Sequence, residues 1–373
     1  MSVLTIRQVQ SESDRRTFVK FPFQLYRNNP FWVPPLIADE IRTLQKEHNP
    51  AFEFCDAAFW LAMRDGQCVG RLGALIHHLH NEKTGEDAGR FTRAEFIDDR
   101  EVTDLLFHTA EKWLKDKGMN KVYGPLGFTN LDMQGMLVEG FDHLPSVASV
   151  YHLPYYQEHL ERLGYRKHID WVEFRLRVVE TPEKARRLAE VIKTRQNLTV
   201  QSLRSKKDML RAGLQIFDVL NVAFAELFSV VPLNDKMKRY YINKYLNVLN
   251  PRFIKIILDK DKNMLGFIIS VPSLSEAMQK ANGKLFPFGF LHLRKAFKNP
   301  EVADLFLTAI DPKYQKMGLS ALLINELQAI LLENGVKYAE TTGILETNHD
   351  AIQHWKNYDH IQHKRKRCYI KPL

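Results

Sequence analysis

The same order of predicted secondary-structure elements occurs twice in this chain of 373 residues, and this repeat constrains the fold more than any other feature. In the first half we expect, in order, a strand at 3–8, a helix at 13–27, a β-hairpin at 59–63/69–76, a strand at 91–97, a helix at 101–117, a strand at 121–123, a helix at 154–163 and a strand at 171–178. In the second half we expect, in order, a strand at 198–203, helices at 208–228 and 235–248, a β-hairpin at 253–258/264–271, a strand at 303–310, a helix at 319–334, a strand at 337–345, a helix at 350–357 and a strand at 366–370. We therefore predict an α+β (mixed α/β) protein of two tandem units, each a mostly antiparallel mixed sheet flanked by helices. The units are 1–178 and 197–373, and a charged linker helix covers 179–196.

Composition and cysteine use point to a globular protein of a reducing compartment. The chain has 45% hydrophobic and 26% charged residues, which is typical of a folded protein. Its three cysteines, Cys55, Cys68 and Cys368, are scattered and form neither a disulfide framework nor a zinc pattern. No stretch reads as a signal peptide or a membrane span, so we expect a cytoplasmic location.

The positive charge is concentrated in the second half. Of the net charge of +9, residues 1–190 contribute −3 and residues 191–373 contribute +12. A basic half beside a slightly acidic one indicates an anionic partner, either nucleic acid or a small molecule that carries several phosphates.

The loop QKMGLS at 315–320 joins a predicted central strand to a long amphipathic helix. The first turn of a helix leaves backbone N–H groups without acceptors, and the helix dipole adds partial positive charge there. Gly318 lets an anion approach the backbone closely, and Lys313 and Lys316 add charge. The stretch predicts either a phosphate-binding loop or an ordinary tight turn.

The pattern Gln-x-x-Gly-x-Ser at this place resembles the Q/R-x-x-G-x-G/A signature of the GNAT superfamily of acyltransferases, with Ser320 as a departure at the last position. Downstream, Asn348 and Ala351 look like the family's N-x-x-A motif. The resemblance covers about 195–373, and both halves together resemble a bacterial group of tandem-GNAT proteins of poorly defined function. It implies that the loop holds the pyrophosphate of acetyl-CoA or another acyl-CoA. The implied cofactor-binding residues are Ile310, Gln315, Lys316, Met317, Gly318, Leu319, Ser320 and Asn348.

The equivalent place in the first half has lost this loop. There the sequence reads Asp98-Asp99-Arg100-Glu101, without glycine and with adjacent carboxylates where a pyrophosphate would lie. We expect this half to support the fold and to form a wall of the acceptor site. The alternative is a cation or amine site made by these acids.

The resemblance also suggests catalytic candidates. Asp304 lies eleven residues before Gln315 on the predicted strand, where histone-type members carry a catalytic Glu, and Glu340 and Glu346 are rivals for the base. The family's Tyr acid, seven residues after the Asn, is replaced by Trp355, so Tyr358 is the candidate that could substitute. Each of these side chains could instead have a purely structural role.

Three further segments leave alternatives open. His77, His78 and His80 could bind metal, but the end of a strand is the preferred interpretation, and we predict no metal site. The run HKRKR at 363–367 predicts a solvated strand edge, with contact to RNA or to the 3′-phosphate of CoA as the alternative. The apolar, basic segment 285–297 predicts a lid, a groove wall or simple core packing.

We expect an acyl-CoA-dependent N-acyltransferase, with acetyl-CoA as the first choice of donor and an amine acceptor, a small molecule or a peptide, in the cleft between the halves. The alternative is a non-catalytic module that binds acyl-CoA or a protein. A transferase that uses aminoacyl-tRNA is a third possibility, although the long helical arm of that group is absent and nucleic acid is not the expected partner. The acceptor, the acyl length and the oligomeric state are not specified by the sequence.

Overall fold

A computed structural model describes residues 3–246, 249–356 and 358–373. The first half contains β1 Leu4–Gln8, α1 Glu12–Leu25, α2 Ile37–Thr43, η1 Pro50–Glu53, β2 Cys55–Arg64, β3 Gln67–His77, α3 His78–Thr84, β4 Ala88–Phe96, α4 Arg100–Asp116, β5 Lys121–Gly124, β6 Met136–Glu139, α5 Tyr155–Arg162 and β7 Arg166–Arg177. Helix α6, Glu183–Arg195, follows. The second half contains β8 Thr199–Ser202, α7 Lys206–Ala223, α8 Asp235–Tyr245, η2 Pro251–Phe253, β9 Ile254–Leu258, β10 Met264–Pro272, α9 Ser275–Ala281, α10 Gly289–Lys298, β11 Val302–Ile310, η3 Pro312–Tyr314, α11 Leu319–Glu333, β12 Tyr338–Thr341, β13 Ile344–Leu345, α12 His349–Lys356 and β14 His360–Pro372.

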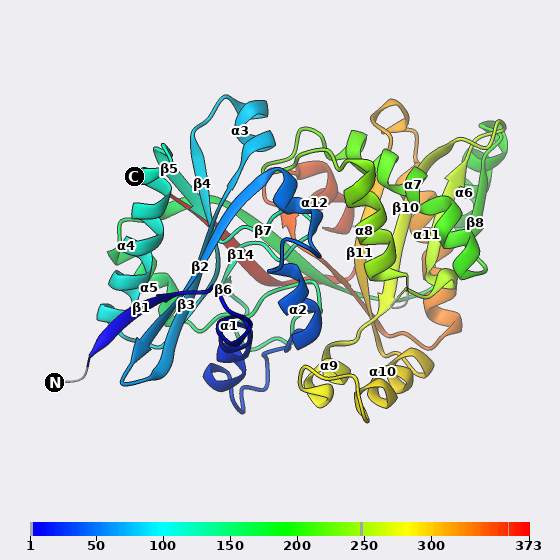
Figure 1. The fold of residues 1–373 in the computed structure, drawn as a ribbon. Helices are drawn as coiled ribbons and strands as arrows, with labels where there is room; N and C mark the ends of the chain where they lie inside the picture. Colours follow the sequence, from blue (N-terminus) through cyan, green and yellow to red (C-terminus); the bar gives the residue numbers. More distant parts are fainter. Residues whose placement is uncertain (1–2, 247–248, 357) are drawn as a thin grey trace.

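The fold class predicted from the sequence is confirmed: a large, mostly antiparallel mixed sheet is flanked by helices (Figure 1). Some element boundaries were wrong. Helix α1 begins earlier than predicted because Ser11, rather than Ser13 or Asp14, forms a capping box with Asp14. The strand predicted at 337–345 is broken into β12 and β13, and the predicted ends at 247–248 and 357 lie outside the described residues.

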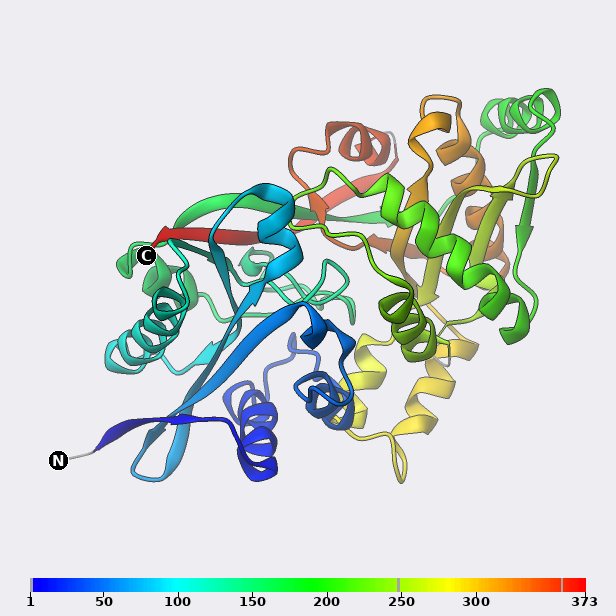
Figure 2. The same ribbon diagram turned by 45° about the horizontal axis from the view of Figure 1, so that its top comes forward.

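One continuous sheet runs through both halves in the order β1-β2-β3-β4-β5-β14-β7-β12-β11-β10-β9-β8. The last strand of each half pairs with the other half: β7 is antiparallel to β12, and β14 is antiparallel to β5. Between them, β7 and β14 pair with each other from His360↔Leu176 to Ile370↔Arg166. Figure 2 shows the red C-terminal strand entering the cyan and green strands of the first half. The division into units at 178 and 197 stays a prediction, and the sheet crosses it without a break.

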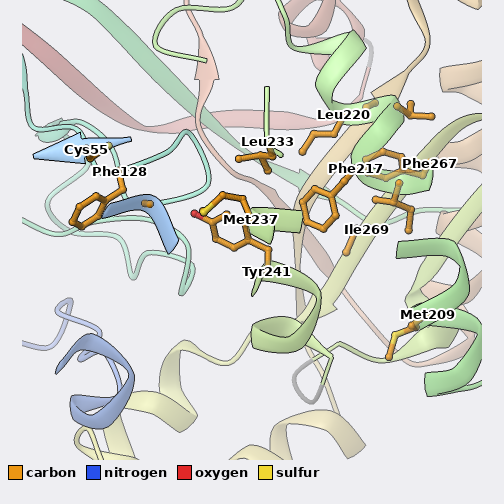
Figure 3. Packing of buried hydrophobic residues seen from close by; sticks show 14 of the residues in the cluster. Cys55, Phe128, Met209, Phe217, Leu220, Leu233, Met237, Tyr241, Phe267 and Ile269 are labelled. Carbon is orange, nitrogen blue, oxygen red and sulfur yellow. The ribbon is translucent and has the colours of Figure 1, made fainter. Parts of the chain in front are cut away.

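A hydrophobic cluster also joins the two halves. It includes Cys55 and Phe128 from the first half with Phe217, Met237 and Tyr241 from α7 and α8 (Figure 3). These residues are nearly inaccessible to solvent, so separating the halves would expose a large apolar area. The two repeated units therefore share one sheet and one hydrophobic cluster.

Candidate functional site

The loop between β11 and α11 presents backbone N–H groups that the protein leaves uncapped. Gly318 is the N-cap of α11 in the left-handed region at φ 81°, and Lys316 is also left-handed at φ 65°. In the part of the chain that the structure describes, no side chain accepts a hydrogen bond from the first turn of α11. An uncapped helix start beside an exposed lysine is suited to an anionic group.

Helix α6 packs over this loop and fixes its shape. The φ of Gly318 favours glycine, and a Cβ atom there would lie 2.6 Å from Cδ1 of Ile192, so any larger residue would have to displace the end of this side chain. The side-chain amide of Gln196 donates to the carbonyl of Met317 at 3.3 Å. The predicted linker helix therefore also supports the loop.

Strand β11 offers an open edge beside the loop. It is paired with the parallel strand β12 only from Val302↔Tyr338 to Leu305↔Thr341, although it stays paired with β10 as far as Ile310. At the point of separation, Thr342 donates its hydroxyl to the carbonyl of Phe306 at 3.1 Å. Beyond that point the β11 edge towards β12 is available to hydrogen-bond an extended ligand.

The loop and the open edge face one large cavity of about 1130 Å³. All the predicted cofactor-binding residues except Met317 line it: Ile310, Gln315, Lys316, Gly318, Leu319, Ser320 and Asn348. Met317 is 41% exposed and lies outside the lining. Asn348 also accepts a hydrogen bond from the Ala351 amide at 3.2 Å and so caps α12. Seven of the eight residues predicted from the sequence to bind the cofactor therefore line one cavity.

The three predicted catalytic side chains do not line this cavity. Asp304 is completely buried, and in the described residues neither carboxylate oxygen has a hydrogen bond of good geometry, although Ser273 and the Val147 backbone are close. Burial, with the neighbouring charge of Glu340, raises the pKa of Asp304 well above its usual value. Such a group resembles a buried neutral acid more than a base that substrate can reach.

Glu340 and Tyr358 are also held inside the protein. Arg175 donates to Glu340 at 2.7 Å, and burial raises the pKa of Glu340 in spite of this partner. Tyr358 packs against Trp355 with ring centroids 6.1 Å apart, in a separate small pocket beneath α11. Glu346, the other rival, forms ion pairs with Lys167 and Arg365.

In the first half the corresponding helix start is occupied by the protein itself. Asp99 caps α4 by accepting from the amides of Glu101 at 2.9 Å and Val102 at 3.3 Å. Arg64 pairs with the same carboxylate at 2.6 Å and lowers its pKa. Asp98 contacts His159 at 2.8 Å. These acids have partners from the chain itself, which supports the view that this half does not bind pyrophosphate.

The end of β4 is closed in a similar way by two tyrosines of α5. Tyr155 donates to the Phe96 carbonyl at 2.6 Å, and the Tyr156 hydroxyl accepts from the Phe96 amide at 3.1 Å. The Tyr156 ring lies 4.2 Å from the Phe96 ring. The two tyrosines therefore fill the space beside the end of β4, whereas the corresponding space beside the end of β11 is open.

Sequence reasoning missed a charged cluster that the first half contributes to the cavity wall. Glu95 accepts hydrogen bonds from Tyr26 and, at 3.1 Å, from Tyr156, and it lies 3.8 Å from the Arg71 guanidinium. Burial raises the pKa of Glu95. Arg71, Glu95 and Asp132 all line the cavity. The available signal was Arg71 within the largely apolar strand β3; Glu95 was not distinctive, because β4 also contains Arg90 and Arg93.

The solvated edge predicted for 363–367 is wrong. Strand β14 lies in the middle of the sheet, and Lys364 and Lys366 are almost completely buried. Lys366 pairs with Glu173 of β7 at 2.8 Å, while burial lowers the pKa of Lys364 to about 8. Counter-charges on the neighbouring strand make this burial possible.

The histidines at 77–80 mark the end of a strand, as preferred from the sequence. His77 ends β3 and accepts from the His80 amide at 3.2 Å, which caps α3. Among the residues with described positions, no group of three potential ligands is arranged to hold a metal ion. No helix in those residues is long and apolar enough to cross a membrane.

Comparisons with known proteins agree with this architecture. No family model matches the sequence. The chain is 30% identical over 378 residues to Protein YghO of Escherichia coli K12, covering 99% of this chain and 95% of that protein. It is 26% identical over 381 residues to the bacterial ceramide synthase of Caulobacter vibrioides, covering 99% and 98%. A tandem GNAT protein from the clavulanic acid biosynthesis pathway superposes on 99% of this chain and 98% of its own with a TM-score of 0.56 at 12% identity, which shows the fold.

Proposed function

The chain belongs to the same family as Protein YghO and has the tandem GNAT fold, and from this premise we propose that it is an acyl-CoA-dependent N-acyltransferase. The single observation that carries the proposal is the uncapped start of α11, which opens, with the unpaired edge of β11, into the large cavity between the halves. The donor's pyrophosphate would lie at the N–H groups following Gly318, with Lys316 beside it. The edge of β11 at 306–310 would hydrogen-bond the amide-containing arm of the donor.

The acceptor amine would bind at the first-half wall of the same cavity. Glu95 is the proposed contact for its amino group, since it is a cavity-lining carboxylate whose pKa is raised by burial. An amine attacks a thioester only as the free base, and the new C–N bond forms as the C–S bond breaks. A nearby carboxylate that accepts the proton from the attacking nitrogen would promote this reaction.

The cavity is suited to an amphiphilic acceptor or a long acyl chain. Its volume of about 1130 Å³ is at or above the usual upper range for small-molecule sites, and apolar side chains such as Phe217, Phe224 and Ile269 line its second-half wall. The relative from Caulobacter vibrioides is named a ceramide synthase, and a ceramide is the amide of a long-chain amino alcohol. We extend this chemistry to the present chain: a long-chain amino alcohol is the proposed acceptor class.

A second candidate is a module that binds acyl-CoA without catalysis. The observation in its favour is that Asp304, Glu340 and Tyr358, the three residues first expected to act in catalysis, all lie away from the cavity wall. The non-catalytic module would bind acyl-CoA at the same site as the proposed N-acyltransferase, but it would not transfer the acyl group.

The test measures amine-dependent release of the CoA thiol and detects the amide by mass spectrometry. It uses acyl-CoA donors of increasing chain length and a panel of long-chain amino alcohols and short amines. We expect thiol release that requires the amine, together with a product whose mass equals acceptor plus acyl group. Binding of acyl-CoA without release across this panel would favour the non-catalytic module.

A matched pair of variants tests the role of Glu95. Glu95→Gln should lower kcat by at least about 100-fold without weakening CoA binding. The control is Glu111→Gln, because Glu111 is also a buried first-half carboxylate, accepts from Tyr165 at 2.9 Å and lies outside the cavity lining. An equal loss of kcat in both variants would contradict the role of Glu95.

A further inference from the structure

The segment between α9 and α10 carries an aromatic cluster that faces solvent. Phe286 and Phe288 are 77% and 69% exposed, and Phe290 and Leu291 at the start of α10 are 41% and 48% exposed. The rings of Phe286 and Phe290 lie 5.8 Å apart, so the residues form one patch. Figure 2 shows this turn, in yellow, projecting away from the sheet. We call these four residues the aromatic tip. Core packing, one of the alternatives for 285–297, does not account for it.

The charged side chains of the segment that carries the aromatic tip are all positive. Lys284, Arg294, Lys295 and Lys298 are exposed, and in the described residues none of them forms an ion pair. The sequence from 277 to 300 contains no aspartate or glutamate. Bulky apolar side chains bordered by lysine and arginine are the pattern of a segment that lies in the interface of an anionic membrane.

The base of this hairpin is fixed to the protein. The Gly283 carbonyl accepts from the Ile37 amide at 3.0 Å, and Gln279 donates to the Pro30 carbonyl at 2.8 Å. Leu274, which precedes α9, Met278 of α9 and Leu293 of α10 line the large cavity. One side of the hairpin thus forms a wall of the cavity while its tip points outward.

We propose that the aromatic tip and its four cations dock the protein on the surface of an anionic lipid bilayer. In this orientation the hairpin lies between the membrane and the cavity, so that a water-insoluble substrate could pass along it. A second copy of the chain fits this surface less well, because a symmetric contact between two tips would bring like charges together. The proposal concerns a docking surface and does not require that acyl transfer take place.

The first experiment is co-sedimentation of the full chain with vesicles of phosphatidylcholine alone or mixed with phosphatidylglycerol. We expect binding to the anionic vesicles that weakens as salt is raised, and little binding to phosphatidylcholine alone. The double variant Phe286→Ser/Phe288→Ser should bind anionic vesicles at least about ten-fold more weakly. Lys295→Glu/Lys298→Glu should also weaken binding at low salt.

The control is Leu188→Ser/Val191→Ser on α6, which removes two apolar side chains that are each 59% exposed, and it should leave vesicle binding unchanged. Unchanged thermal unfolding midpoints will show that all variants are folded. Equal binding by the wild type and the tip variant, or equal loss in the control, would overturn the proposal. Concentration-dependent dimerisation that requires the tip, without vesicle binding, would overturn it in favour of a protein interface.

A gain of signal provides an independent readout. Phe288→Trp should show a blue-shifted emission and quenching by brominated lipid that exceed those of the wild type, and Leu188→Trp should not. An absence of extra quenching in Phe288→Trp while the protein is bound to vesicles would show that another surface faces the bilayer. None of these measurements uses acyl-CoA, so their failure is distinguishable from failure of the proposed enzymatic function.

Discussion

Helices α4 and α11 begin at corresponding places in the two halves, but the backbone N–H groups of their first turns have different partners. Both follow a strand that is parallel to its neighbour, and both present unpaired N–H groups at their first turn. At α4 the Asp99 carboxylate accepts from those groups and is neutralised by Arg64. At α11 a left-handed Gly318 begins the helix and no side chain in the described residues caps it.

The comparison shows that a few local residues make the two corresponding helix starts different. In the first half a short connection at 97–99 brings an internal carboxylate to the helix start, and Tyr155 and Tyr156 close the adjoining strand end. In the second half the connection at 311–318 is longer, and no side chain of the described residues caps the helix that follows it. The first helix start therefore has a ligand from the chain itself, and the second is the one proposed to bind an external anion.

The strands that precede these two helices, β4 and β11, also differ at their third residue. Arg90 of β4 and Asp304 of β11 are both buried and stand opposite the parallel neighbour strand. Arg90 donates to the Gly127 carbonyl at 3.1 Å, whereas the oxygens of Asp304 lack a well-formed hydrogen bond among the described residues. The buried Arg90 is thus hydrogen-bonded to backbone carbonyls, whereas burial and the charge of Glu340 raise the pKa of Asp304.

The largest expected effect comes from making α11 resemble α4. Gly318→Glu places a carboxylate at the proposed anion site, and its Cβ would also collide with Ile192. CoA affinity measured by calorimetry should fall at least about 100-fold, or roughly 2.7 kcal/mol. Gly335→Glu is the matched control, since Gly335 is also left-handed, at φ 73°, but lies at the other end of α11 with open space around it. If both variants bind CoA as the wild type does, the loop is not the site.

The second prediction concerns Asp304 and pH. A raised pKa means that the folded state holds a proton that the unfolded state releases, so stability falls as the pH rises above 3.8 towards the folded pKa. The slope is at most about 1.4 kcal/mol per pH unit. Asp304→Asn removes this loss, so its free energy of unfolding relative to that of the wild type should increase as the pH is raised above 3.8 in urea titrations. A pH-independent difference would contradict a protonated Asp304.

The third prediction removes the internal ligand of α4. Asp99→Ala deletes the cap and the partner of Arg64, and it should reduce the free energy of unfolding by about 1–2 kcal/mol. Glu101→Ala, whose side chain is 80% exposed, should cost less than about 0.5 kcal/mol. CoA affinity should be unchanged in both, because α4 is not the donor site. A fall in CoA affinity in Asp99→Ala alone would assign the first half a role in donor binding.

The smallest effect is expected at Ser320, the departure from the usual signature. Ser320→Ala restores a residue of the family pattern and keeps the backbone N–H that the loop is proposed to use. CoA affinity should remain within about two-fold of the wild type, which is less than about 0.5 kcal/mol. A large loss would show that the Ser320 hydroxyl is itself a ligand.

The sequence was informative where the signal is local. The loop around Gly318, the strand before it, the helix after it and the acids at the start of α4 are read from neighbouring residues, and their placement agrees with the structure. The strand exchange could not be read in this way. The burial of Lys364 and Lys366 depends on pairing with β7, nearly two hundred residues away in the chain, and the run HKRKR alone resembles a solvated edge.

The cavity wall was missed for the same reason. Glu95, Tyr26 and Tyr156 come together from three separate elements, and only the assembled halves place Glu95 beside the loop cavity. Conversely, spacing along β11 correctly identified Asp304 as a residue of the strand, but spacing contains no information on depth. The structure buries it completely.

The most direct test of the central claim is the stoichiometry of CoA binding to the wild-type chain by titration calorimetry. Of the two corresponding helices, α4 starts with a side-chain cap and α11 starts without one, which predicts one CoA per chain. That binding should disappear in Gly318→Glu and persist in Gly335→Glu. No binding would contradict the proposed donor site, and two CoA molecules per chain would contradict the difference between α4 and α11 on which the account rests.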